Sequence, residues 1–218
     1  MREDLLALRR HAEEEPDRHG TGTAAQDGGR RVVWRAGLAG FSTKPHAVPL
    51  TPAWRLFLLG DGSATRSLSL LTGADIRVDV IEMQDLADEA DGPEELDQVA
   101  APQLRRRVWL RADGGAILGY AVSWWNARLA RDYLTDPALP IGTNLDSLRC
   151  APHRDIRSVF HARCPRVEAA FGYPGPFWGR DYLMRERGET LCLIREVFSP
   201  TLERSLGPGS GPSGAGHR

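Results

Sequence analysis

The sequence lacks the long hydrophobic runs and the one-sided charge that mark several classes of protein. None of its apolar runs approaches the roughly 20 residues that cross a bilayer, and its N-terminus, MREDLLALRR, is too charged for a signal peptide. The chain carries 28 basic and 29 acidic residues, for a net charge of −1. We therefore expect neither a nucleic acid nor a membrane as partner, and a cytoplasmic location.

Cysteines are few and catalytic motifs are absent. Cys150, Cys164 and Cys192 form neither a CxxC pair nor an even-numbered framework, which is typical of reduced thiols in the cytoplasm. The six histidines are scattered and include no HxE or HExxH motif. A GxSxG elbow, a phosphate loop and a dinucleotide fingerprint are also missing. The sequence predicts neither a metal nor a cofactor.

Composition divides the 218 residues into three regions. Residues 1–49 are predicted to form a largely flexible arm, because much of this region is rich in Gly, Asp and Arg and has no apolar period. A short helix is possible over residues 1–14, and Val32 to Trp34 is either a strand or a docking segment. Residues 50–206 are predicted to form a single domain, which we expect to be a monomer. Residues 207–218, GPGSGPSGAGHR, are predicted to be a disordered tail.

Helix and strand signals within the domain are grouped rather than alternating. Thr51 is a good N-cap for a helix that begins at Pro52, and Asp113-Gly114 is a strong signal for a β-hairpin. This grouping indicates an α+β fold with an antiparallel sheet. Helices are expected at residues 52–59, 64–71, 126–134 and 143–148, and strands at 76–80, 105–110, 116–124 and 154–160.

A second hairpin is predicted between Phe177 and Pro200, with strands at 182–187 and 191–198 joined at Gly188. Its second strand places Glu196 on one face with Cys192, Ile194 and Phe198, because side chains alternate across a strand. A carboxylate in such apolar company is costly unless it is paired. Two interpretations stay open: an edge-strand glutamate that points at water, or a paired and buried carboxylate.

Arginines in apolar rows are the other candidates for chemistry. Arg106 shares a strand face with Val108 and Leu110, and a buried guanidinium is expected to meet a carboxylate. That carboxylate belongs either to Glu196, in a structural ion pair, or to a bound ligand. Arg180 is a second arginine of this kind, for which we favour a role in fastening the hairpin.

Five stretches of the chain, in their order and spacing, resemble the chorismate pyruvate-lyase family, in particular its branch in cyanobacteria and actinobacteria. They are LFLLGDGSATRSL, RRVWLRADGGAILGYAVSWWN, LPIG, GPFWGRDYL and LIREVFSP, and the resemblance covers about residues 50–206. It implies an antiparallel sheet of about six strands, with helices packed on it and flap-like segments over an internal pocket. It also implies cleavage of chorismate into 4-hydroxybenzoate and pyruvate without metal or cofactor.

The resemblance also implies roles for individual residues. The family's carboxylate-binding arginine falls on Arg106, and its essential glutamate falls on Glu196. Backbone groups that hold the carboxylate on the ring and its surroundings fall near Tyr120, Ile141 and Ala64. Because the better-studied bacterial branch has glycine at the position of Tyr120, the pocket wall is expected to differ there.

Chorismate is a dianion, so its second carboxylate needs donors of its own, and Arg154 and Arg180 are the candidates. Glu196 is expected to bind the 4-hydroxyl and to assist loss of the ring proton, either as a general base or by orienting the substrate for an internal proton transfer. Aromatisation supplies a large driving force, so the protein would act mainly through positioning and electrostatics.

Two other functions are compatible with the same pattern. The fold also serves as a non-catalytic effector-binding domain in some transcription regulators, and a fold does not by itself fix an activity. Such regulators carry a DNA-binding winged helix at the N-terminus, and residues 1–50 are too short and too Gly-rich to form one. A related enzyme that releases a different hydroxybenzoate isomer is the remaining alternative. Analysis of the products formed from chorismate distinguishes the three.

Overall fold

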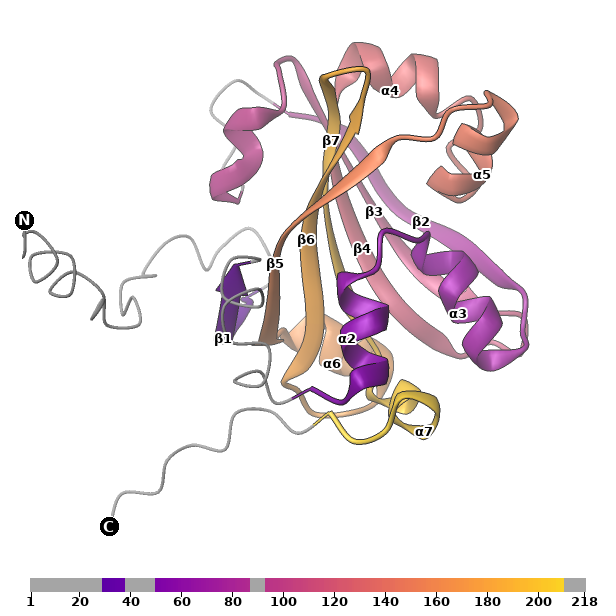
Figure 1. Ribbon diagram of the computed structural model, residues 1–218, viewed down its shortest axis with the longest axis vertical. Helices are drawn as coiled ribbons and strands as arrows, with labels where there is room; N and C mark the ends of the chain where they lie inside the picture. The colour runs from indigo at the N-terminus through magenta and orange to yellow at the C-terminus, as the bar shows by residue number, and fades with distance from the viewer. Residues whose placement is uncertain (1–28, 38–49, 87–92, 210–218) are drawn as a thin grey trace, which may run out of the picture.

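The computed structural model describes residues 29–37, 50–86 and 93–209. These residues form one antiparallel sheet of seven strands, in the order β1-β5-β6-β7-β4-β3-β2, with helices packed against it (Figure 1). The predicted α+β fold is confirmed, with one strand more than expected. The helix predicted for residues 1–14 lies outside the described residues.

The strands are β1 (Arg31–Gly37), β2 (Ile76–Asp85), β3 (Gln103–Ala112), β4 (Ile117–Asn126), β5 (His153–Arg163), β6 (Phe177–Glu186) and β7 (Glu189–Phe198). The helices are α2 (Pro52–Leu59), α3 (Ala64–Thr72), α4 (Ala127–Tyr133), α5 (Ile141–Ser147), α6 (Pro165–Phe171) and α7 (Glu203–Leu206), with 3-10 turns η3 (Glu94–Gln98) and η4 (Pro200–Leu202).

Local sequence signals account for several element ends. The Thr51 hydroxyl accepts a hydrogen bond from the backbone N–H of Trp54 at 3.2 Å, which confirms the predicted cap of α2. Helix α3 ends at Gly73, which has a φ of +70° that suits a residue without a Cβ. The turn between β6 and β7 uses Gly188 in the same left-handed region, with a φ of +87°.

Two helices differ from the predicted elements. Helix α5 begins at Ile141, and its N-cap residue, Pro140, lies three residues before the predicted cap at Thr143. Helix α6 was not predicted, although Pro165 at its start and Gly172 after its end are regular helix signals. With seven residues it is too short to show a clear apolar period.

The alternation of side chains gives the sheet two different faces. On one face, Leu58 of α2 and Leu68 of α3 belong to a core cluster with Val108 of β3. On the other face, Val167 of α6 packs in a cluster with Tyr120 of β4. Figure 1 shows α2 and α3 in front of the sheet and α6 behind it. The helices therefore cover both faces, and the candidate site lies on the face of α2 and α3.

Residues 31–37 lie within the predicted arm but form the edge strand β1, which pairs antiparallel with β5. Arg35 of β1 donates from Nε to the hydroxyl of Ser158 at 3.0 Å, and its Nη2 forms an ion pair with Glu95. The strand considered at Val32 to Trp34 is therefore present and longer than expected, and it belongs to the sheet rather than to an arm beside it.

The first residues of the predicted tail contact the domain. The indole N–H of Trp54 donates to the carbonyl of Gly207 at 2.9 Å, and the backbone N–H of Gly209 donates to Glu203 at 3.0 Å. The boundary of the domain thus lies slightly beyond Leu206. Residues 210–218, which make up the rest of the tail, lie outside the described residues.

Two nested deletions test the contribution of β1. Removal of residues 1–30 is expected to leave the melting temperature nearly unchanged, because that segment lacks an apolar pattern that would join the core. Removal of residues 1–37 also deletes β1 and the contacts of Arg35, and should lower the melting temperature by roughly 4–8 °C, which corresponds to about 2 kcal/mol. Calorimetry measures both values, and equal melting temperatures for the two deletions would show that β1 adds no stability.

Candidate functional site

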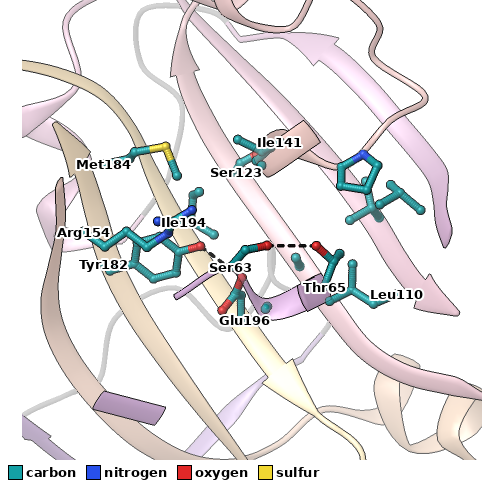
Figure 2. A pocket seen from close by; sticks show the side chains of 16 residues that line it. Ser63, Thr65, Leu110, Ser123, Ile141, Arg154, Tyr182, Met184, Ile194 and Glu196 are labelled. Carbon is teal, nitrogen blue, oxygen red and sulfur yellow. Dashed lines mark hydrogen bonds between the residues drawn. The ribbon is translucent and has the colours of Figure 1, made fainter. Parts of the chain in front are cut away.

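A pocket opens on the sheet face that carries α2 and α3, between the first turn of α3 and the start of α5 (Figure 2). Its empty space is about 470 Å³, a figure that includes the open mouth. Apolar side chains from four strands form most of the wall, among them Val78, Val108, Leu110, Ala121 and Ile194. The pocket therefore suits a small molecule with an apolar body.

Glu196 places a carboxylate in this apolar wall. Its side chain is only 6% exposed, and it lies on β7 between β6 and β4, so the edge-strand interpretation is wrong. One oxygen, Oε2, accepts from Nε of Arg180 at 2.7 Å, and the other, Oε1, accepts from the hydroxyl of Tyr182 at 3.0 Å. A carboxylate has about four acceptor sites. Glu196 is therefore held on both oxygens and still has lone pairs for a ligand.

Tyr182 is a site residue that the sequence analysis missed. It lies two residues after Arg180 on β6, so strand alternation puts both on the face of Glu196. Burial raises the pKa of the Tyr182 phenol, and the negative charge of Glu196 raises it further. The phenol is consequently protonated at physiological pH and acts as a hydrogen-bond donor to the carboxylate.

Arg180 connects Glu196 to the end of α2. Its Nη1 donates to the carbonyls of Phe57, Leu58 and Gly60 at 3.2, 3.4 and 2.8 Å, and its Nη2 donates to Gly62 at 3.4 Å. The last carbonyls of a helix have no intrahelical partner and carry the negative end of the dipole, so a guanidinium is well placed there. Every nitrogen of this side chain already has a partner within the protein.

A glycine next to Arg180 permits this arrangement. A Cβ at Gly179 would collide with the ring of Phe160 and with the backbone carbonyl of Glu196. The chain can therefore bring Arg180 directly opposite Glu196 in the β6–β7 register. Although burial by itself lowers the pKa of Arg180, the neighbouring carboxylate outweighs it and raises the pKa above the usual value. The guanidinium of Arg180 therefore keeps its positive charge.

Arg106 does not pair with Glu196, and that interpretation of its partner is wrong. The two residues lie on β3 and β7, which are separated by β4, and Arg106 is in register with Ser123 rather than with Ala121, the neighbour of Glu196. The ion pair of Glu196 is instead with Arg180. Side-chain alternation predicted the face of the sheet on which Arg106 lies, but it did not predict that β4 separates β3 from β7.

Arg106 instead binds the segment that leads to α5. Its Nε and Nη2 donate to the carbonyl of Pro137 at 3.2 and 2.7 Å, and Nη2 also donates to Leu139 at 3.1 Å. The residue is 2% exposed, and burial lowers its pKa to about 10. Among the residues that the structure describes, no carboxylate forms an ion pair with this guanidinium, so Arg106 is a buried cation held by neutral carbonyls.

Arg154 lines the pocket from β5. Its Nη1 donates to the carbonyl of Asp61 at 2.9 Å, in the loop between α2 and α3, whereas its Nε is buried and has no hydrogen-bond partner. Figure 2 shows the side chain beside the ring of Tyr182. Of the three predicted arginines, Arg154 is thus the one whose side chain both lines the pocket and has a hydrogen-bond donor without an acceptor.

The remaining predicted residues divide between the two sheet faces. Ala64 at the start of α3 and Ile141 at the start of α5 both line the pocket. The side chain of Tyr120 lies on the opposite face, with its ring centroid 4.8 Å from that of Trp109. The neighbouring residue, Ala121, occupies the pocket wall in its place. The structure therefore brings Ala64, Ile141, Arg154, Glu196 and, behind Glu196, Arg180 together.

A second ion pair joins β6 and β7 on the reverse face. Nε of Arg195 donates to Oδ1 of Asp181 at 2.7 Å, and the hydroxyl of Ser158 donates to Oδ2 at 3.1 Å. Burial by itself would raise the pKa of Asp181, but the charge and hydrogen bonds of Arg195 outweigh it and hold the pKa below the usual value. Each face of the sheet thus has one ion pair between β6 and β7. On one face the arginine belongs to β6, and on the other face it belongs to β7.

Two kinds of feature are absent from residues 29–37, 50–86 and 93–209. No three His, Cys, Asp or Glu side chains gather there in an arrangement that holds a metal ion. No helix in these ranges combines the length and apolar character required to cross a bilayer.

Comparison with known proteins places the chain in a family. A family model described as chorismate pyruvate-lyase Rv2949c-like matches residues 58–206. Two uncharacterised proteins called ycf21, from Pyropia yezoensis and Cyanophora paradoxa, are 32% and 30% identical to this chain over 157 and 151 residues. These matches cover 72% and 69% of this chain, and 85% and 78% of the two relatives.

Solved structures with the same fold include the effector domain of PhnF from Mycobacterium smegmatis. Its TM-score is 0.51 at 18% identity, and the match covers 66% of this chain and 92% of that domain. At this level of identity the likeness shows a shared fold alone. The sequence match over residues 58–206 is the finding that decides the family: the chain belongs to the Rv2949c-like chorismate pyruvate-lyase family.

Proposed function

We propose that this protein is a cytoplasmic, monomeric lyase that converts chorismate to 4-hydroxybenzoate and pyruvate without a metal or cofactor. One observation carries the proposal: Glu196, at the position of the family's essential glutamate, lies in an apolar pocket with both oxygens held by Arg180 and Tyr182. A buried carboxylate held so firmly, with lone pairs facing a pocket, is suited to act on one hydroxyl group of a bound ligand.

The pocket wall fits the chemistry of this substrate. Apolar side chains such as Val108, Leu110 and Ile194 contact the carbon ring, while the remaining lone pairs of Glu196 accept a hydrogen bond from the 4-hydroxyl. Because Arg180 and Tyr182 already fix the carboxylate, binding the hydroxyl requires little further ordering of side chains.

The reaction is an elimination. The C4–H bond of chorismate breaks and its electron pair forms the C3–C4 double bond, while the C3–O bond breaks and enolpyruvate leaves to be protonated to pyruvate. The C4 proton passes either to Glu196 or directly to the departing group. In both routes Glu196 holds the 4-hydroxyl on the carbon that loses its proton. Because aromatisation drives the reaction, the contribution of the protein is orientation and charge stabilisation.

Arg106 is proposed to bind the carboxylate on the ring. It is a buried cation without a carboxylate partner in the described ranges, and it shares the face of β3 on which Val108 and Leu110 line the pocket. Two neighbours of Arg106 line the pocket. One is Ser123, which lies opposite it on β4, and the other is Pro140, which follows the acceptor Leu139 in the chain. A ligand carboxylate would supply the counter-charge that neutral carbonyls do not.

Incubation of the purified protein with chorismate in the presence of a chelator tests the proposal directly. Pyruvate and 4-hydroxybenzoate are expected in equal amounts, measured by a coupled dehydrogenase assay and by chromatography. Activity that disappears with chelator and returns with an added metal would contradict the cofactor-free mechanism. Release of another hydroxybenzoate would keep the lyase class and change the product.

Substitutions at Arg106 and Glu196 should have different effects. Arg106 is assigned to a carboxylate that both substrate and product carry, and charge-assisted hydrogen bonds contribute roughly 1.5–3 kcal/mol each. Arg106→Ala should therefore weaken 4-hydroxybenzoate binding by about 100-fold or more. Glu196→Gln keeps the shape of the side chain, so it should lower kcat by roughly 100-fold or more while product affinity changes by less than about fivefold.

Matched controls for these two variants lie on the same strands. Arg111→Ala on β3 and Glu189→Gln on β7 change the same residue types outside the pocket and should leave kcat and product affinity unchanged. If the roles were only structural, Arg106→Ala and Glu196→Gln would mainly lower the melting temperature, because an orphaned buried charge costs roughly 3–5 kcal/mol. A folded Arg106→Ala that binds product normally would remove Arg106 from the site.

Tyr182→Phe tests whether the phenol positions Glu196. Loss of its hydrogen bond to Oε1 frees one carboxylate oxygen, so kcat is expected to fall by about 5- to 30-fold, the equivalent of roughly 1–2 kcal/mol. The affinity for 4-hydroxybenzoate and the melting temperature should change little, because the ring packs as before. Tyr173→Phe, on an exposed side chain, is the control. An unchanged kcat in folded Tyr182→Phe would show that Arg180 alone positions Glu196.

A ligand-binding domain without catalysis is the second candidate function. The fold shared with the effector domain of PhnF favours it, because that structure shows the fold in a protein named as an effector domain. In this case the protein would bind hydroxylated carboxylates in the same pocket but release no pyruvate from chorismate. The incubation with chorismate therefore distinguishes the two candidates.

A further inference from the structure

The three arginines near the pocket differ in how many of their donors are already in use. Arg180 donates from Nε, Nη1 and Nη2 to Glu196 and to backbone carbonyls. Arg106 uses Nε and Nη2 on two carbonyls behind the wall. Arg154 makes a single hydrogen bond, from Nη1 to the carbonyl of Asp61. Arg154 therefore has the largest number of unused donors among the three.

The unused donors of Arg154 include a buried one. Its Nε is inaccessible to solvent and has no hydrogen-bond partner, and the side chain forms part of the pocket wall. A buried polar group without a partner is unfavourable and rare in native proteins, so it indicates a site where a ligand supplies the acceptor. Within the ranges that the structure describes, Arg154 also forms no ion pair with an acidic side chain. A ligand anion would satisfy both the donor and the charge.

The position of Arg154 relative to Glu196 indicates which part of a ligand it would reach. Tyr182 lies between them: its hydroxyl donates to Glu196, and its ring lies beside Arg154 (Figure 2). If the 4-hydroxyl of a ring lies at Glu196, the group on the adjacent ring carbon is the one that points along the wall toward Arg154. In chorismate this neighbouring group, at C3, carries the second carboxylate.

The same wall contains the first turn of α3. Ser63 and Thr65 bond each other through their hydroxyls at 2.9 Å, and Ser63 does not cap a backbone N–H of the helix with its side chain. Both residues line the pocket together with Ala64. The positive end of the helix dipole therefore adds to the charge of Arg154 on one side of the cavity.

We propose that Arg154 is the residue by which this pocket selects a dicarboxylate over a monocarboxylate, through contact with a carboxylate carried by an ether group at C3 of a ring. The inference rests on the proposed function for the orientation of the ring. Substrate would contact Arg154, whereas 4-hydroxybenzoate, which has lost the C3 group, would not. Cleavage therefore removes one of the charged contacts of the ligand and favours release of the product.

Binding measurements with stable aromatic compounds test this without turnover. The probe is 3-(carboxymethoxy)-4-hydroxybenzoate, which has the substitution pattern of chorismate, and its partner is 4-hydroxy-3-methoxybenzoate, which keeps the ether but lacks the second carboxylate. Titration calorimetry on Arg154→Met should show about 10- to 100-fold weaker binding of the dicarboxylate. Binding of the methoxy compound should change by less than about threefold.

Arg157→Met is the matched control, because it removes an arginine from the same strand that is exposed and paired with Asp155. It should change neither affinity. Equal weakening of both compounds by Arg154→Met, or of neither, overturns the inference, and so does a wild-type protein that binds neither compound. An Arg154-dependent preference in a protein that releases no pyruvate from chorismate would instead refute the lyase function and support the role of Arg154.

Discussion

The buried ion pair between Arg180 and Glu196 is the interaction on which the rest of the site depends. It joins β6 to β7 at the back of the pocket, and the same guanidinium binds the last carbonyls of α2 and the loop after it. Because removing one partner of such a pair costs roughly 3–5 kcal/mol, the carboxylate cannot change its position independently of α2. The geometry of the acid is therefore tied to the element that leads into the first turn of α3, which forms another part of the pocket wall.

The second ion pair, between Asp181 and Arg195, fixes the register of β6 and β7 together with the first. A slip of β7 by one residue against β6 would turn the other face of β7 toward the pocket, and would put Arg195 beside Arg180 in place of Glu196. Both ion pairs would then be broken, which separates four buried charges from their oppositely charged partners. The pairs on the two faces thus specify one alignment more strictly than the apolar residues around them, since those residues are similar on both faces.

Sequence reasoning predicted the faces of the strands better than their neighbours. Alternation correctly placed Glu196 with Ile194 and Arg106 with Val108, because the side-chain period is a local property of a strand. The partner of Arg106 was wrong because the order of strands in the sheet depends on long-range packing that no local pattern contains. Tyr182 could have been found by applying the same alternation to β6. The prediction at Tyr120 concerned backbone groups, and that the side chain of Ala121 rather than of Tyr120 lines the pocket required the observed orientation of β4.

The charged side chains in and beside the pocket do not balance among the described residues. Arg106, Arg154 and Arg180 face a single acidic partner, Glu196, so two positive charges have no counter-ion among the described residues. Like charges repel each other most where water is excluded, which applies to Arg106, whereas Arg154 is only half-buried. A molecule with two negative charges would neutralise the excess and stabilise the fold by mass action at the same time. Such a molecule would therefore protect the protein from unfolding, to an extent that grows with its concentration.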